Sequence, residues 1–93
     1  MTSPRVILIT GANRGIGYSI AQALGTASPD DILLIASRSK TNAEVAIDQL
    51  RKDAGIESRM YPVQINVTDN ATIEIAQNWI EHEFGHLDGS LKT

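Results

Sequence analysis

Apolar positions along the chain alternate between two spacings. Residues 6–9 and 32–36 are short, continuous apolar runs, which is typical of strands buried on both faces of a sheet. The segment 61–67 predicts a third strand. After each strand, apolar residues recur every three or four positions, which indicates a helix with one buried face. The pattern therefore predicts the order strand, helix, strand, helix, strand, helix.

Polar caps and glycines predict the bounds of the three helices. Thr41 and Glu44 form a capping box that opens the second helix, and Asp69 caps the third. Each helix is expected to end at a glycine, namely Gly25, Gly55 or Gly85. The predicted inward faces are, helix by helix, Ile16, Ile20, Ala23 and Leu24; Ala43, Ala46, Ile47, Leu50 and Ala54; and Ile73, Ala76, Ile80 and Phe84.

This alternation is typical of an α/β fold in which right-handed helical crossovers join parallel strands. The 93 residues make one domain, and the order of elements matches the N-terminal βαβαβα half of a Rossmann-like, doubly wound parallel sheet. Leu87 is expected to start a fourth strand that remains incomplete. Because ligands bind beyond the carboxyl ends of such strands, residues 10–17, 37–38 and 66–67 should lie along one rim.

The composition limits which classes of partner and which cellular compartment we expect for this chain. The chain is 42% hydrophobic and 20% charged, which is ordinary for a soluble globular protein. Its net charge of -3 gives no reason to expect nucleic acid, which calls for a clustered basic face. No apolar run approaches the roughly 18 residues that a membrane span requires, and no cysteine is present. We therefore expect a cytoplasmic protein with no membrane or nucleic-acid partner.

The run of residues 10–17 joins the first strand to the first helix and is rich in glycine. Gly11 allows a tight backbone turn, Gly15 allows the backbone to approach a pyrophosphate, and Gly17 allows the helix to lie close to the sheet. The free amides and partial positive charge of the helix N-terminus then favour phosphate. The position between a strand and a helix supports a dinucleotide site over a merely tight turn.

The glycine spacing, G-x-x-x-G-x-G, also points to a family. Residues 10–17, Thr-Gly-Ala-Asn-Arg-Gly-Ile-Gly, resemble the cofactor motif T-G-x-x-x-G-x-G of the short-chain dehydrogenases/reductases. The resemblance extends over residues 5–89 and includes the segments 35–38, 66–69 and 84–89. It implies a nicotinamide dinucleotide cofactor and, in the full-length family, hydride transfer between a carbonyl and an alcohol.

The resemblance also assigns roles by position. Thr10 would steady the turn, Asn66 and Val67 would flank the adenine, and the pyrophosphate would be lined by Gly11, Gly15, Ile16 and Gly17. Many family members carry Asp at the position of Asn66. Because an amide can still hydrogen-bond the base, we expect a weaker preference there rather than a loss of binding.

Charge after the second strand predicts the choice of cofactor. An acidic residue there would bind the ribose 2′-hydroxyl and repel a 2′-phosphate. This chain has Ser37 and Arg38 instead, with Arg14 as a second cation in the glycine turn. Guanidinium groups match phosphate oxygens, so NADP(H) is favoured over NAD(H), and solvated arginines are the alternative. The predicted cofactor-binding residues are Thr10, Gly11, Asn13, Arg14, Gly15, Ile16, Gly17, Ser37, Arg38, Asn66 and Val67.

The catalytic residues of the family have no counterpart in these 93 residues. In the family, the fourth strand continues into an N-N-A-G segment, and a serine and a Tyr-x-x-x-Lys helix follow. Tyr18 and Tyr61 are the only tyrosines, and neither has a lysine four positions on. We therefore expect no catalytic residue in this chain, and nucleotide binding without turnover. The abrupt change after Gly89 suggests a truncated or mis-spliced product, or an incomplete gene model.

Two other functional classes compete with this interpretation. His82, Glu83 and His86 match H-E-x-x-H, in which two histidines one helical turn apart bind zinc. Gly85 should end the helix before His86, and a third ligand is missing, so we expect no metal site. The other class is a non-catalytic nucleotide-binding module. Half of a doubly wound sheet would leave its first strand at an edge, which invites self-association or pairing with a full-length homologue.

Overall fold

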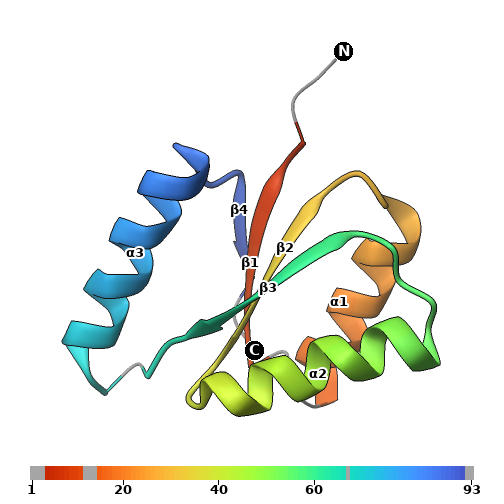
Figure 1. The fold of residues 1–93 in the computed structure, drawn as a ribbon, viewed down its shortest axis with the longest axis horizontal. Coiled ribbons are helices and arrows are strands. Elements are labelled where there is room, and N and C mark those ends of the chain that lie inside the picture. Colours follow the sequence, from red (N-terminus) through yellow and green to blue (C-terminus); the bar gives the residue numbers. More distant parts are fainter. Residues whose placement is uncertain (1–3, 12–14, 67, 92–93) are drawn as a thin grey trace.

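The computed structural model describes residues 4–11, 15–66 and 68–91. Strands and helices alternate along these residues, as the sequence predicts (Figure 1). The elements are β1 (Val6–Thr10), α1 (Gly15–Ala27), β2 (Ile32–Ser37), α2 (Lys40–Asp53), β3 (Arg59–Gln64), α3 (Asn70–Phe84) and β4 (Gly89–Leu91). The α/β class and the predicted order of the first six elements are confirmed.

The strands form one parallel sheet with the order β3-β2-β1-β4. α1 and α2 cover one face of this sheet and α3 covers the other (Figure 1). Successive strand residues point to opposite faces, so each strand contributes to both halves of the core. Ile9, Leu33 and Ile35 pack on the side of α1 and α2, and Leu8 and Leu34 pack on the side of α3. Burial on both faces explains why the first two strands are continuous apolar runs.

The predicted end of the first helix at Gly25 is wrong, because α1 continues to Ala27. Gly25 is buried, and a Cβ atom added there would lie 2.6 Å from Cγ2 of Ile56. Glycine is therefore required by close packing against the segment before β3, and not by a helix end. The buried face also differs from the prediction, since Ala21 is buried and Ala23 is exposed.

The capping box predicted at Thr41 is wrong as well. Ser39 is the N-cap of α2, because its Oγ accepts the N–H of Asn42 at 3.4 Å, and Thr41 lies inside the first turn. A serine directly before the helix satisfies the first amides without the glutamate of a capping box. The predicted inward face is confirmed at its buried positions, which are Ala43, Ala46 and Leu50.

α3 begins and ends where the sequence predicts. Asp69 is its N-cap, with Oδ1 accepting the N–H of Ala71 at 3.0 Å. Gly85 follows the helix with a φ of 75°, and Gly55 follows α2 with a φ of 63°, so both predicted glycine ends are confirmed. Within the described part of the chain, none of the helices is long and apolar enough to cross a membrane.

β3 covers Arg59–Gln64 instead of the predicted segment 61–67. Beyond Gln64 the chain keeps one further bond to the end of β2, in which the N–H of Ile65 donates to the carbonyl of Ser37 at 2.8 Å. Asn66 then turns the chain toward α3, because its Oδ1 accepts the N–H of Thr68. Such a turn within the chain competes with strand pairing and ends the strand early.

β4 begins at Gly89, two residues later than the predicted start at Leu87, which is 41% exposed. It pairs with β1 from Ile7 opposite Gly89 to Ile9 opposite Leu91. β1 is therefore an inner strand, and the prediction that it lies at an edge of the sheet is wrong. The edges are formed by β3 and by the three-residue β4.

Polar contacts join the amino ends of the strands, at the edge of the sheet opposite the predicted rim. Nη2 of Arg5 lies 2.7 Å from Oδ2 of Asp31, whose side chain is 8% exposed. The hydrogen bond to Asp31, together with its charge, raises the pKa of Arg5. Oδ2 of Asp88 accepts the N–H of Val6 at 2.7 Å. These contacts tie the segments before β1, β2 and β4 together and leave the carboxyl ends as the open edge.

Candidate functional site

The carboxyl ends of the strands lie at one edge of the sheet, because all the strands are parallel (Figure 1). β1, β2 and β3 end there at Thr10, Ser37 and Gln64, and the helix that follows each strand begins at the same edge. The start of a helix carries partial positive charge and amides without helical partners, both of which favour anions. We call residues 10–11, 15–17, 37–40, 64–66 and 68–72 the carboxyl edge.

Two glycines, one directly after β1 and one at the first position of α1, adopt a backbone conformation that other residues avoid. Gly11 has a φ of 67° and Gly15 a φ of 61°. Among the described residues, a Cβ atom at Gly15 would meet no atom within 4 Å, so its conformation and not a lack of space calls for glycine. Gly15 is exposed and is the first residue of α1. Gly15 therefore presents an exposed backbone position at the start of a helix.

Most of the predicted site residues are brought together at the carboxyl edge. Asn13, Arg14 and Val67 lie outside the described residues. Thr10 ends β1 and Gly17 is buried in the first turn of α1. The predicted residues that lie at this edge are Thr10, Gly11, Gly15, Ile16, Gly17, Ser37, Arg38 and Asn66.

The turn after β2 holds two predicted residues and two that sequence reasoning missed. Ser37 is buried, and its Oγ accepts the N–H of Ser39 at 3.5 Å. Arg38 is exposed, and its position is held through the backbone, since its carbonyl accepts a hydrogen bond from Nε2 of Gln64 at 3.2 Å. Ser39 is partly buried and Lys40 is exposed. The signal for Ser39 was its place as a serine directly before a helix, which is a preferred N-cap.

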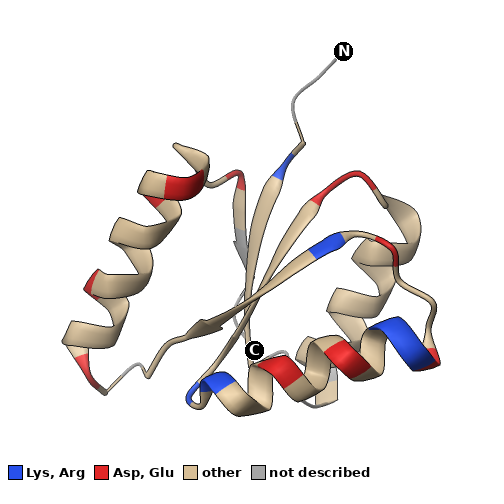
Figure 2. Ribbon diagram, in the orientation of Figure 1, with Lys and Arg blue, Asp and Glu red and all other residues tan. Residues whose placement is uncertain are grey.

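Positive charge gathers at this turn. Arg38 and Lys40 flank Ser39, and Figure 2 shows basic positions where β2 passes into α2. Among the ion pairs of the described residues, none involves Arg38 or Lys40. The nearest acidic residue along the chain after β2 is Glu44, which lies in the second turn of α2. An anion at this turn would therefore meet two cations and the start of a helix.

Asn66 lies in the turn between β3 and α3 and is partly buried. Its Oδ1 accepts the N–H of Thr68 at 3.1 Å and the hydroxyl of Thr68 at 2.7 Å. The N–H of Asn66 donates to Oγ1 of Thr72 at 2.9 Å. Because Oδ1 already accepts a backbone N–H, the side-chain nitrogen is the group that Asn66 offers to a ligand.

Gln64 and Thr72 are supporting residues that the sequence did not reveal. Gln64 positions the carbonyl of Arg38 across the β2–β3 pair, and Thr72 bonds both the N–H and the carbonyl of Asn66 from the first turn of α3. Neither belongs to a recognisable motif. Their roles follow from pairings between elements, which the local sequence does not encode.

The two histidines of H-E-x-x-H do not share a helical face. His82 lies in the last turn of α3, and Gly85 leaves the helix in the left-handed conformation before His86. Nε2 of His86 lies 3.0 Å from Oδ2 of Asp88, the carboxylate that also accepts the N–H of Val6. His86 thus contributes to the junction of β1 and β4, and this geometry gives no support to the zinc hydrolase alternative.

Comparison with known proteins identifies what this arrangement is similar to. A family model described as short chain dehydrogenase matches residues 5–91. The chain is 38% identical over 88 residues to the short-chain dehydrogenase anuI of Penicillium roqueforti, and the match covers 95% of this chain and 33% of that protein. It is 32% identical over 84 residues to carbonyl reductase (NADPH) 1 of Oryctolagus cuniculus, and this match covers 90% of this chain and 29% of that protein.

The fold of the chain is also similar to that of solved reductase structures. Menthone neomenthol reductase from Mentha piperita superposes with a TM-score of 0.87 at 26% identity, and the match covers 99% of this chain and 32% of that one. The chain therefore spans about a third of the length of the proteins it matches.

Proposed function

The chain belongs to the short-chain dehydrogenase family, and on this basis we propose that it is the NADP(H)-binding part of a reductase. The observation that carries the proposal is the carboxyl edge, where a glycine turn, three helix starts and a basic turn converge. Hydride transfer between a carbonyl and an alcohol is proposed for a longer protein, since the matched relatives are about three times as long.

The glycine turn would hold the pyrophosphate. Gly11 and Gly15 have φ values of 67° and 61°, and a Cβ atom at Gly15 would meet none of the described residues within 4 Å. A phosphate could therefore approach the backbone at the first residue of α1, where the amides have no helical partner. Gly17 would allow the same helix to stay close to the sheet, in keeping with its burial.

The turn after β2 would hold the 2′-phosphate of NADP(H). Arg38 is exposed and offers a planar guanidinium, and Lys40 adds a second positive charge at the start of α2. A cofactor with a free 2′-hydroxyl would instead require an acceptor, and the residues from Ser37 to Lys40 include no carboxylate. The relative from Oryctolagus cuniculus carries NADPH in its name, which supports the same choice.

Asn66 would contact the adenine from the turn after β3. Its Oδ1 is held by Thr68, so its side-chain nitrogen would donate to a ring nitrogen of the base. An aspartate could make the same turn but would have no such donor. The hydrogen bond would therefore run from the side chain of Asn66 to the base, in the direction opposite to a bond accepted by a carboxylate. This fits a weaker preference for adenine rather than a loss of binding.

The cofactor would supply the hydride, and these 93 residues would supply its binding site. The two tyrosines have packing roles. Tyr18 is partly buried against the core between the sheet and α1 and α2. The ring of Tyr61 lies 6.1 Å from that of Trp79 and 5.6 Å from that of Phe84. We therefore expect cofactor binding without carbonyl reduction by this chain.

The experiment is a calorimetric titration of the 93-residue chain with NADPH and with NADH. We expect NADPH to bind at least about tenfold more tightly, because a charge-assisted hydrogen bond contributes about 1.5–3 kcal/mol. Arg38→Asp should reverse this preference, since a carboxylate there repels the 2′-phosphate and accepts the 2′-hydroxyl. Arg59→Asp is the matched control, because Arg59 is exposed at the opposite end of β3.

The outcomes separate the parts of the proposal. Equal affinities for the two cofactors in the parent chain would refute the NADP(H) choice. Binding of neither cofactor would refute the function itself. A change in preference that is as large in Arg59→Asp as in Arg38→Asp would show that overall charge, and not the turn after β2, discriminates between the cofactors.

A further inference from the structure

The end of β2 and the residue after it are held by two consecutive hydrogen bonds from the neighbouring segment of the chain. Ser37 and Gln64 form the last pair between β2 and β3. The N–H of Ile65 donates to the carbonyl of Ser37 at 2.8 Å. Nε2 of Gln64 donates to the carbonyl of Arg38 at 3.2 Å. The first bond is ordinary backbone pairing, and the second extends it by one residue through a side chain.

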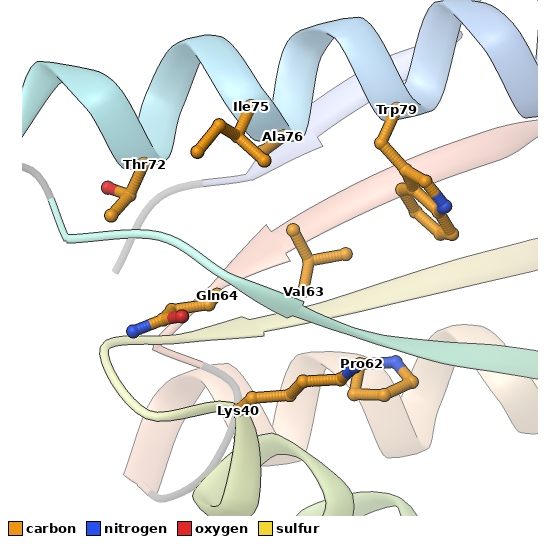
Figure 3. A pocket seen from close by; sticks show the side chains of 8 residues that line it. All are labelled: Lys40, Pro62, Val63, Gln64, Thr72, Ile75, Ala76 and Trp79. Atoms are coloured by element: carbon orange, nitrogen blue, oxygen red, sulfur yellow. The ribbon is translucent and has the colours of Figure 1, made fainter.

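The alternation of side chains along β3 directs Gln64 to this turn. Val63, directly before it, packs on the α3 side of the sheet, so Gln64 points to the side on which α2 lies. In Figure 3 the amide end of Gln64 lies beside the turn that leads from β2 to Lys40. Because a carbonyl only accepts hydrogen bonds, the nitrogen of this amide and not its oxygen must face Arg38.

The guanidinium of Arg38 is held only through its backbone. Arg38 is exposed, and its side chain takes part in none of the ion pairs or hydrogen bonds formed between the described residues. Its direction therefore depends on the peptide groups before and after it. The bonds to the carbonyls of Ser37 and Arg38 fix both of these groups. A fixed backbone lowers the cost of ordering the arginine when a ligand binds.

The turn after β2 is the part of the proposed cofactor site that distinguishes NADPH from NADH. The glycine turn and Asn66 would contact groups that both cofactors carry. Thr72, which bonds the N–H and the carbonyl of Asn66, would therefore support both cofactors equally. Arg38 would contact the 2′-phosphate, which only NADPH carries. A residue that acts through Arg38 should therefore change the ratio of the two affinities.

From these contacts we infer that Gln64 is a positioning residue that sets the preference of the site for a 2′-phosphate. Gln64 does not touch the cofactor. Its amide holds the peptide between Arg38 and Ser39, and this peptide directs the guanidinium toward the phosphate. The inference rests on the proposed function, since it requires the 2′-phosphate to lie at Arg38. It adds to the basic turn a residue of another strand, 26 positions further along the chain.

Gln64→Met tests the inference, because methionine keeps the length of the side chain but has no N–H to donate. Calorimetric titration with NADPH and with NADH gives the ratio of the two Kd values. We expect Gln64→Met to reduce the preference for NADPH by about twofold to tenfold, which is the range for one neutral hydrogen bond. The affinity for NADH should stay as in the parent chain. Gln49→Met is the matched control, since Gln49 is an exposed glutamine of α2, and it should leave the ratio unchanged.

A double-mutant cycle separates positioning from a direct contact between Gln64 and the cofactor. Arg38→Met removes the guanidinium but keeps the carbonyl to which Gln64 donates. In that background Gln64→Met should cause no further change in the ratio, because no guanidinium remains to be positioned. A direct contact would reduce the preference by the same factor in both backgrounds.

The hydrogen bond can also be followed without a cofactor. The N–H of Ser39 belongs to the peptide whose carbonyl accepts the bond from Gln64. In nuclear magnetic resonance spectra of the unliganded chain, the amide signal of Ser39 should therefore shift in Gln64→Met and stay in place in Gln49→Met. An unchanged Ser39 signal in Gln64→Met would overturn the inference, whatever the cofactor does.

The titrations distinguish failure of the inference from failure of the proposed function. Equal affinities for NADPH and NADH in the parent chain, or binding of neither, would refute the NADP(H) choice and the inference together. A preference for NADPH that Gln64→Met leaves unchanged would overturn the inference alone. An equal loss of affinity for both cofactors in Gln64→Met, or the same change of ratio in the Arg38→Met background, would also overturn it.

Discussion

Glycines in this chain meet two different physical requirements at single positions. Gly55 follows α2 with a φ of 63°, and a Cβ atom there would meet no atom of the described residues within 4 Å. Gly25 lies inside α1, where a Cβ atom would lie 2.6 Å from Cγ2 of Ile56. Backbone conformation thus requires glycine at the first position and lack of space requires it at the second. The two requirements have separable consequences for stability.

Gly25→Ala should destabilise the fold by about 1–3 kcal/mol through overpacking, partly offset by the higher helix propensity of alanine. In an Ile56→Ala background the clash disappears, so the same substitution should stabilise by about 0.5–1 kcal/mol. Urea unfolding of the four proteins in this double-mutant cycle measures the difference.

Gly55→Ala is the control for that cycle. It should cost about 1–2 kcal/mol in both backgrounds, because the cost comes from φ and not from Ile56. An equal cost of Gly25→Ala with and without Ile56→Ala would contradict the packing explanation.

At the scale of elements, the N-cap of α2 decides how the basic turn is built. Ser39 caps the helix and stands between Arg38 and Lys40, so the same residue sets the helix start and spaces the two cations. Ser39→Ala should destabilise the fold by about 0.5–2 kcal/mol, because it leaves an amide of the first turn without its acceptor. Thr41→Ala, inside that turn, should cost much less. Thermal unfolding compares the two, and the opposite ranking would restore the capping box at Thr41.

The elements show what sequence could and could not predict. Features that depend only on neighbouring residues were predicted correctly. They are the apolar runs of β1 and β2, the Asp69 cap, and the ends of α2 and α3 at Gly55 and Gly85. The continuation of α1 through Gly25 depends on Ile56, which is far along the chain. A local rule that glycine ends a helix cannot detect such a contact.

The candidate site divides in the same way. The glycine turn, Arg38 and Asn66 were predicted because a motif or a strand end marks each of them. Gln64 and Thr72 were missed, since each acts by bonding to another element of the carboxyl edge. The three-residue β4 was placed two residues early, because its pairing with β1 and not its own apolar pattern defines it.

At the scale of the whole molecule, the two ends of the sheet differ in character. The amino ends are joined by Arg5 with Asp31 and by Asp88 with the N–H of Val6. The carboxyl ends instead bring together open backbone, helix starts and two cations outside the ion pairs of the described residues. One end holds the strands in register, and we propose that the other end binds an anionic ligand.

This polarity can be tested by nuclear magnetic resonance on the isotope-labelled chain, with NADPH added in steps. The amide signals of Gly11, Gly15, Ser39 and Asn66 should shift most, since all four lie at the carboxyl edge. The signals of Asp31 and Asp88, at the amino ends of the strands, should stay in place. Saturable shifts confined to the first group would support cofactor binding at the carboxyl edge. Shifts centred on Asp31 and Asp88, or no shifts at all, would contradict it.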